Sequence, residues 1–376
     1  MKYSIEIGKI IEGALKHDQM KVLNYANQLI YKLEVDNDVR AASKIRKMLD
    51  TQSETTLSAM GLHSESVVPV DTESRMTLAD VVLPENNEID VILSKRNFEQ
   101  LESFVMSYKN ADKLNSMGLG LSNTLMLYGP PGCGKTKCAY LIAKRLQLPL
   151  VVARLDSLIS SYLGTTAKNI RALFDYAQRT PCVLFLDEFD AIAKARDDSN
   201  ELGELKRVVN SLLQNVDAMS KDSILIAATN HEQLLDPAVW RRFDYKLQID
   251  LPDSRAIEQM LDVFLRDSLS LSIDEKQELA CVMKGLSGAN VEEIVMKALR
   301  NAIVHGVEIS KQDIFEYFFN FKGLIPPTCE DEKKALQIKA RYLRQLDEKR
   351  FSLQVIASIL GCSKTTVQKL VKEVEV

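Results

Sequence analysis

The chain has 376 residues and a formal net charge of −4, with 46% hydrophobic and 27% charged residues. This composition is typical of a soluble globular protein, and the length predicts several domains rather than one core. No apolar run is long enough for a membrane helix, the amino-terminal residues lack a secretion signal, and the six cysteines form no metal-binding pairs. We therefore expect a cytoplasmic protein with reduced thiols and no membrane partner.

Residues 1–50 predict three short helices, because apolar residues recur there at helical spacing. Asp18 is placed to cap the second helix, and residues 36–38 predict the next turn. The length and spacing resemble microtubule-interacting-and-trafficking (MIT) domains, although any small helical bundle shows the same spacing. Residues 51–77 are rich in Ser, Thr and Glu and lose the helical period, as a flexible linker does.

Residues 78–250 alternate between strand-like and helix-like segments. The strand-like runs are continuously apolar, which predicts a parallel sheet covered by helices on both faces. They occupy residues 124–128, 150–153, 182–186, 224–227 and 245–249. Residues 251–323 predict a further helical domain.

A glycine-rich loop follows the first apolar strand and precedes a helix, which is the context that a phosphate-binding loop (P-loop) requires. Its backbone N–H groups would surround the phosphates of ATP, Lys135 would reach the β- and γ-phosphates, and Thr136 would bind Mg²⁺. The alternative is a chance glycine turn. The predicted nucleotide-binding residues here are Gly129, Pro130, Pro131, Gly132, Cys133, Gly134, Lys135, Thr136 and Lys137.

Polar residues end the next two strands of this domain. Asp187 is suited to the Mg²⁺ shell, and Glu188 is suited to deprotonating the attacking water. Asn230 is suited to hydrogen bonding with the γ-phosphate or that water. Taken alone, acidic residues after a strand are more often helix caps, and an asparagine there is usually a turn residue. The P-loop upstream favours the catalytic interpretation.

Arg241 and Arg242 precede the last strand. They form either a salt-bridged surface pair or the arginine that P-loop enzymes use to stabilise the transferring phosphoryl group. The sequence leaves open which of the two arginines is dominant.

These motifs together resemble the classical clade of AAA ATPases, which includes katanin, spastin and the proteasomal ATPases. The resemblance runs from Leu78 to Phe321, and residues 287–290 (Ser-Gly-Ala-Asn) resemble the clade's lid segment. It implies a five-stranded sheet in the order 5-1-4-3-2, a helical lid, and a hexameric ring of identical subunits. It also implies that Gly288 and Ala289 border the adenine and that Arg241 and Arg242 act on a neighbouring subunit's nucleotide.

The resemblance also gives a role to residues 161–164 (Ser-Tyr-Leu-Gly), because an aromatic–aliphatic–glycine loop here grips a polypeptide in the central pore of the family's rings. Read alone, Tyr162 and Leu163 would be core residues. Two positions depart from the family pattern: Thr165 replaces a glutamate, and the motif around the arginines is shortened.

The carboxyl-terminal segment from Lys333 to Val376 has ten Lys/Arg and four Asp/Glu residues, a net charge of +6. Residues 336–376 resemble a bacterial helix-turn-helix, in which Ala357 packs under the second helix and Gly361 makes the turn. The groove-facing residues would be Lys364, Thr365, Thr366, Gln368 and Lys369. The alternative is a helical hairpin that contacts protein.

Two functions remain open at this point. In the first, a ring hydrolyses Mg-ATP and pulls on a protein threaded through its centre. In the second, a regulatory ATPase associates with DNA through its carboxyl-terminal helices. No metalloprotease HExxH motif is present in the sequence, so proteolysis would require a separate partner.

Overall fold

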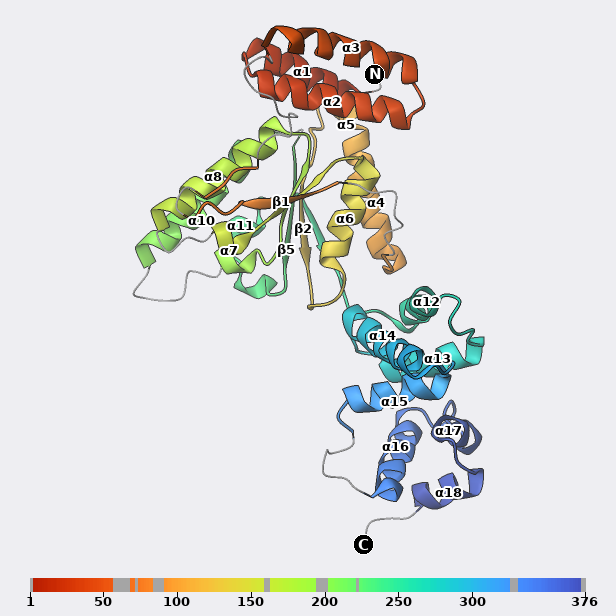
Figure 1. The fold of residues 1–376 in the computed structure, drawn as a ribbon. Coiled ribbons are helices and arrows are strands. Elements are labelled where there is room, and N and C mark those ends of the chain that lie inside the picture. Colours follow the sequence, from red (N-terminus) through yellow and green to blue (C-terminus); the bar gives the residue numbers. More distant parts are fainter. Residues whose placement is uncertain are drawn as a thin grey trace. The chain divides into compact units, whose positions relative to one another are not determined.

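The computed structural model describes residues 3–56, 68–71, 74–83, 91–158, 163–193, 202–220, 223–324 and 331–372. These form two compact units (Figure 1). The first contains the amino-terminal helices and the sheet, and the second contains residues 130–134 and everything from Asp250 onward. Among the described residues, no helix is both long and apolar enough to cross a bilayer.

The amino-terminal helices α1 (Ser4–Leu15), α2 (Gln19–Val35) and α3 (Val39–Thr56) form a bundle (Figure 1). Its core consists of Leu29, Ile30, Leu33 and Ala42. The Asp18 carboxylate caps α2 by accepting a hydrogen bond from the Lys21 N–H (3.1 Å), as its position predicted. MIT membership is not established by these helices, because the same arrangement suits many small bundles.

Polar contacts join this bundle to one end of the sheet. The Lys9 Nζ donates to Ser220 Oγ (2.6 Å), Arg179 pairs with Asp18 (3.4 Å), and the Gln28 amide donates to the Gln147 carbonyl. The contacted residues Gln147, Arg179 and Ser220 each precede a strand. The bundle therefore covers the amino ends of the strands, whereas the predicted nucleotide-binding residues follow the carboxyl ends.

The sheet has the strand order β1-β3-β4-β5-β2-β6. Its last five strands along the chain pair in parallel, in the predicted order 5-1-4-3-2. Buried apolar residues explain the continuous runs of β2 to β5, whereas β6, at the edge, is not continuously apolar and buries only Leu247. The α/β P-loop fold is therefore confirmed. The strands are β1 (Ala79–Val82), β2 (Thr124–Tyr128), β3 (Leu150–Ala153), β4 (Val183–Leu186), β5 (Ile224–Thr229) and β6 (Tyr245–Gln248).

The sequence did not predict β1, which pairs antiparallel with β3 at the edge of the sheet. Its two central residues, Asp80 and Val81, are exposed, so it lacks the continuous apolar run of the inner strands. An edge strand that is half exposed carries a weaker hydrophobic signal.

Helices cover both faces of the sheet, with α8 and α10 on one side and α4 and α6 on the other (Figure 1). The buried faces of α8 and α10 meet a core that includes Phe174, Phe185 and Phe189. The helices of this domain are α4 (Lys95–Lys109), α5 (Ala111–Ser116), α6 (Lys135–Leu146), α7 (Leu155–Leu158), α8 (Leu163–Arg179), α9 (Asp190–Ala193), α10 (Leu202–Ala218), the 3-10 turn η1 (Glu232–Leu234) and α11 (Pro237–Trp240).

The second unit is helical, and one hydrophobic core runs through all of its helices. Phe315, Phe318 and Phe319 of α15 are almost fully buried between the lid helices and the carboxyl-terminal helices. The lid comprises α12 (Ser254–Leu265), α13 (Ile273–Met283), α14 (Gly288–His305) and α15 (Lys311–Phe321), and the tail comprises α16 (Glu332–Leu346), α17 (Leu353–Leu360) and α18 (Lys364–Lys372).

Candidate active site

The predicted P-loop connects the end of β2 to the start of α6. Gly129 has φ +135°, and a Cβ atom there would lie 2.2 Å from the Ile249 carbonyl oxygen. Only glycine therefore fits at this bend. The helix that follows has twelve residues, so its N-terminus offers unpaired N–H groups and positive potential toward the loop.

Lys135 and Thr136 open α6. Lys135 is 6% exposed, and its Nζ donates to the Gly129 carbonyl (2.7 Å), so the ammonium group lies against the loop. The Thr136 hydroxyl donates to an Asp187 carboxylate oxygen (2.7 Å). The structure thus brings together the predicted phosphate-binding lysine and the two predicted Mg²⁺ ligands.

These groups fit the chemistry of Mg-ATP. A hydroxyl and a carboxylate are hard oxygen donors, and Mg²⁺ takes one or two such protein ligands with phosphate oxygens and water. Among the described residues, no group of three or more His, Cys, Asp and Glu side chains could hold a metal. The Thr136 hydroxyl and the Asp187 carboxylate are suited to a Mg²⁺ ion that arrives with a nucleotide.

Glu188 follows Asp187 at the end of β4 and is exposed. Its φ is +48°, a left-handed conformation that costs a non-glycine residue about 1–3 kcal/mol. Both neighbours fix this conformation. Asp187 accepts from the Glu188 N–H (2.9 Å), while the buried Phe189 donates its N–H to the Ala228 carbonyl (2.8 Å) and contacts Phe243 edge-on. The backbone that carries the exposed Glu188 carboxylate is thus fixed on both sides.

The sheet register brings the end of β5 to the same edge. Thr229 pairs with Tyr128, the residue before Gly129, and Leu186 of β4 pairs with Ala227. Asn230, half buried, therefore follows β5 at the level where the P-loop begins. The Thr229 hydroxyl donates to Asp190 (2.8 Å), which ties β5 to the residues after Glu188.

The two predicted arginines differ sharply in their surroundings. Arg242 donates from Nε and Nη2 to both oxygens of Asp217 (3.0–3.2 Å) and from Nη1 to the Ala238 carbonyl (2.8 Å). Arg241 is exposed, and its guanidinium makes no hydrogen bond or ion pair with any described residue. Asp217 gave no signal in the sequence, because an aspartate near the end of an amphipathic helix is usually solvated.

The lid segment meets the tip of the P-loop within the second unit. The Ala289 N–H donates to the Gly132 carbonyl (3.0 Å), and Ser287 caps α14 by accepting from the Asn290 N–H (3.3 Å). A Cβ on Gly132 would lie 2.8 Å from Ser287 Oγ. A Cβ atom on Gly288 would lie 3.5 Å from the Gly132 carbonyl oxygen. The sequence did not predict that Ser287 caps α14 and lies close to Gly132.

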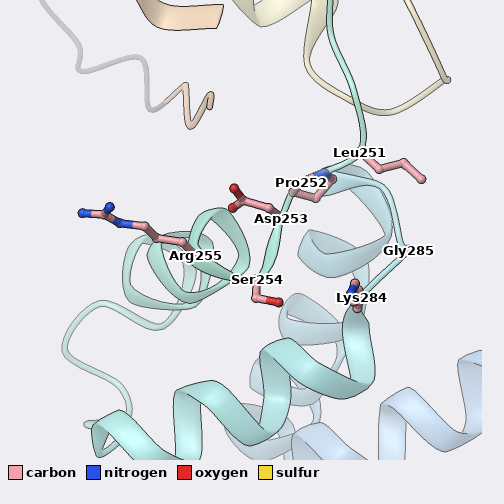
Figure 2. A pocket seen from close by; sticks show the side chains of 7 residues that line it. All are labelled: Leu251, Pro252, Asp253, Ser254, Arg255, Lys284 and Gly285. Atoms are coloured by element: carbon pink, nitrogen blue, oxygen red, sulfur yellow. The ribbon is translucent and has the colours of Figure 1, made fainter. Parts of the chain in front are cut away.

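A separate pocket of about 540 Å³ opens at the start of α12 and before α14 (Figure 2). The Asp253 carboxylate in this pocket already caps α12, and Figure 2 shows Arg255 pointing away from Lys284. Its polar groups do not converge, and none of the predicted site residues lines it. It is formed by Leu251, Pro252, Asp253, Ser254, Arg255, Lys284 and Gly285.

The remaining predicted residues belong to the P-loop segment and to the expected pore loop. Cys133 is half buried in the loop and Lys137 is exposed on α6, while Pro130 and Pro131 complete the loop tip. Burial raises the pKa of the neighbouring Cys138 thiol to about 12, against a smaller opposing effect of Lys135, so this thiol stays protonated. Tyr162, predicted for the pore loop, lies outside the described residues.

Comparisons with known proteins agree with this geometry. Residues 125–251 match the family model described as "ATPase family associated with various cellular activities (AAA)". The chain is 40% identical over 281 residues to an uncharacterized AAA family ATPase, y4kL, of Sinorhizobium fredii, covering 74% of this chain and 83% of the relative. It is 33% identical over 238 residues to the ATP-dependent zinc metalloprotease FtsH of Thermus thermophilus, covering 60% of this chain but only 38% of that relative.

Proposed function

Because this chain belongs to the AAA family of ATPases and hydrolyses ATP, we propose that it is a subunit of a ring-shaped motor that remodels other proteins. Six identical subunits would form the ring, with each ATP bound where two subunits meet. The sequence resemblance to hexameric remodelling ATPases motivates this proposal.

Within one subunit, the residues at the sheet edge have distinct roles in the proposal. Lys135 donates to phosphate oxygens, and Thr136 and Asp187 supply ligands to Mg²⁺, which neutralises charge on the phosphates when bound. Glu188 accepts a proton from the attacking water, since its carboxylate is exposed and its backbone is held in place. Asn230 orients that water from the neighbouring strand. Gly288 and Ala289 hold the loop tip and border the base.

The observation that carries the ring proposal is the contrast between the two arginines. The guanidinium of Arg242 is committed to Asp217 and Ala238 of its own chain, whereas Arg241 is exposed with no partner among the described residues. An arginine that acts on another subunit's phosphate must be free to leave its own surface. Such an arginine contributes roughly 10³–10⁵ in rate. We therefore assign the trans-acting role to Arg241 and a positioning role to Arg242.

A polypeptide is the proposed substrate. The segment at 161–164 that resembles a pore loop lies immediately before and at the start of α8, away from the P-loop in sequence. One relative is named an ATP-dependent metalloprotease, which links its ATPase part to work on proteins. This chain spans only 38% of that relative, and no metal cluster is formed by the described residues, so proteolysis is not part of the proposal.

The test is the rate of ATP hydrolysis with and without a permanently unfolded, reduced and alkylated polypeptide. The polypeptide should stimulate the wild-type rate. Tyr162→Ala should retain the basal rate and lose the stimulation, while Tyr31→Ala, which removes an exposed tyrosine of α2, should retain both. Equal stimulation of wild type and Tyr162→Ala would contradict protein threading, as would the absence of any stimulation by polypeptide.

A further inference from the structure

The tail contains two short helices joined by a tight turn. Gly361 ends α17 in a left-handed conformation (φ +65°), and Ser363 begins α18 by accepting a hydrogen bond from the Thr366 N–H (3.1 Å). Ala357, Val367 and Leu370 are buried in the shared core. The two helices are thus held together by packing, with α16 against both of them (Figure 1).

The opposite side of α18 is polar and exposed. Its side chains fall into two kinds: lysines, and the short or amide side chains that can donate and accept hydrogen bonds. The Ser363 hydroxyl lies 2.8 Å from the hydroxyls of both Thr365 and Thr366, which orders the start of this face. The exposed residues are Lys364, Thr365, Thr366, Gln368, Lys369 and Lys372.

The lysines of this face are uncompensated. Lys364, Lys369 and Lys372 form no ion pair with any described residue, and no Asp or Glu occurs between Lys349 and Lys372. Elsewhere in the tail, Lys339 pairs with Glu316 and Arg344 pairs with Glu348, whereas Lys334, Arg341 and Lys349 form no ion pair with a described residue. The three unpaired lysines of α18 lie within one helix of nine residues, which favours a polyanion as its partner.

The chemistry of the face favours nucleic acid over protein. Protein interfaces are enriched in aromatic and apolar anchors and depleted in lysine. The apolar side chains Val367 and Leu370 of α18 point into the core, and among the described residues of α17 and α18 no large apolar side chain is exposed. Lysines suit phosphates, and threonine and glutamine suit base edges in the major groove.

We propose that the exposed face of α18 binds duplex DNA, which goes beyond the proposed protein-remodelling function and does not depend on it. The helix would enter the major groove, with Lys364, Lys369 and Lys372 contacting phosphates and Gln368 reaching a base edge. Contacts with the lid hold α17, against which α18 packs: the Gln312 amide donates to the Ser358 carbonyl of α17 (3.1 Å), and Arg350 before α17 donates to the Gln277 carbonyl (2.8 Å).

The test is the binding of the full-length chain to a labelled 30-base-pair duplex of random sequence, measured by fluorescence anisotropy over a range of salt concentrations. The triple variant Lys364→Ala/Lys369→Ala/Lys372→Ala should bind at least about tenfold more weakly at 50 mM salt, because three phosphate contacts are lost. The slope of log affinity against log salt should fall by about 3 for each engaged tail. Gln368→Ala should keep the affinity for random duplex.

The matched control removes the same charge from the lid, as Lys284→Ala/Lys297→Ala/Lys322→Ala, and should bind DNA like wild type. Basal ATP hydrolysis in all variants shows that each chain is folded. If both triple variants lost the same affinity for duplex DNA, the loss would reflect overall charge rather than the α18 face, and the proposal would be overturned. A folded wild-type chain that does not bind the duplex at 50 mM salt would also overturn the proposal. So would a result in which the α18 lysines are needed for binding polyglutamate but not DNA, because the partner would then be an acidic protein.

Discussion

Arg241 and Arg242 are adjacent in sequence but differ in what holds them. Arg242 uses its whole guanidinium on Asp217 and the Ala238 carbonyl, and the buried Phe243 beside it packs edge-on against Phe189, next to Glu188. Arg242 therefore fixes the end of α11, and through it the direction in which Arg241 leaves the surface. A residue that is bound this way contributes to stability, whereas the exposed Arg241 is the one that we propose to act on a neighbouring subunit's phosphate.

Arg242→Ala should consequently lower the melting temperature by about 2–4 °C, the effect of about 1 kcal/mol for a partly exposed bidentate pair. Asp217→Ala should lower it by no more than that, because the hydrogen bond from Arg242 to the Ala238 carbonyl remains, and the double variant should lose no more than Arg242→Ala alone, because the ion pair is already gone there. Arg241→Ala should leave the melting temperature within about 1 °C while ATP turnover falls. Thermal unfolding followed by circular dichroism checks this. A drop for Arg241→Ala equal to that for Arg242→Ala would reverse the assignment.

Glu188 is held in a left-handed conformation by its two neighbours, so its side chain can change without loss of the nucleotide ligands beside it. Glu188→Gln should keep ATP binding near the wild-type affinity and slow hydrolysis by about 10²–10⁴, since the proton acceptor is lost. Lys135→Ala should instead weaken ATP binding itself. Nucleotide binding by isothermal titration and turnover by phosphate release separate the two effects. Near wild-type turnover in Glu188→Gln would show that another group accepts the proton.

At the scale of whole elements, the loop between β2 and α6 meets the first turn of α14. The Ala289 N–H binds the Gly132 carbonyl, and Gly132 has no room for a side chain because Ser287 Oγ and Ala289 Cβ would lie 2.8 and 2.9 Å from its Cβ. Van der Waals contact requires more space than this. The conformation of the phosphate loop and the start of the lid are thus mutually dependent.

Gly132→Ala should therefore weaken ATP binding by at least about tenfold, because the loop tip or the lid must move. Gly118→Ala is the matched control: Gly118 has nearly the same φ (+72° against +74°), but a Cβ there meets no atom within 4 Å. Both variants introduce backbone strain, and only Gly132→Ala adds a steric clash with Ser287 and Ala289. Binding of a fluorescent ATP analogue measures the difference, and equal losses in the two variants would mean that strain alone is responsible.

The sequence predicted the inner elements well because their signals are local. Strands buried on both faces are continuously apolar, and a P-loop has a fixed spacing of glycines, so a parallel sheet and the group Lys135, Thr136 and Asp187 could be anticipated. The strand order came from the resemblance to AAA ATPases. The half-exposed edge strand β1 has no such signal. The role of Asp217 is also invisible in sequence, because it comes from a contact with a distant segment. Residues 287–290 were recognised as the lid segment, but the closeness of Ser287 to Gly132 was not, for the same reason.

The polar contacts between the amino-terminal bundle and the sheet could not be predicted for the same reason, because they join segments that are far apart in the sequence. Lys9 is 1% exposed and donates to Ser220, which is 211 positions away, and a lysine in an amphipathic helix would ordinarily be read as solvated. Burial of such a charge is favourable only when partners surround it, and Glu12 supplies one at 3.4 Å. No periodicity in the sequence could reveal this arrangement.

At the scale of the proposed assembly, the described residues of one subunit include all the proposed catalytic groups, but the arginine proposed for the transferring phosphate acts on a neighbouring subunit. Lys135 lies against Gly129, Arg242 is bound to Asp217, and Arg241 is exposed. Two identical subunits that meet through this surface could complete each other's sites, and a closed ring would complete all of them. The central claim is therefore that hydrolysis belongs to a pair of subunits.

Mixing two inactive variants tests this claim most directly. Arg241→Ala keeps Glu188 but lacks the trans-acting arginine, and Glu188→Gln keeps Arg241 but lacks the base. Each alone should be nearly inactive, and an equal mixture should recover up to roughly a quarter of the wild-type rate, since one ordered neighbour pair in four combines both intact groups. Mixing Arg241→Ala with the double variant Arg241→Ala/Glu188→Gln should recover nothing. If mixed assemblies form but the first mixture stays as inactive as its components, or if Arg241→Ala alone hydrolyses ATP at the wild-type rate, the site is complete within one subunit.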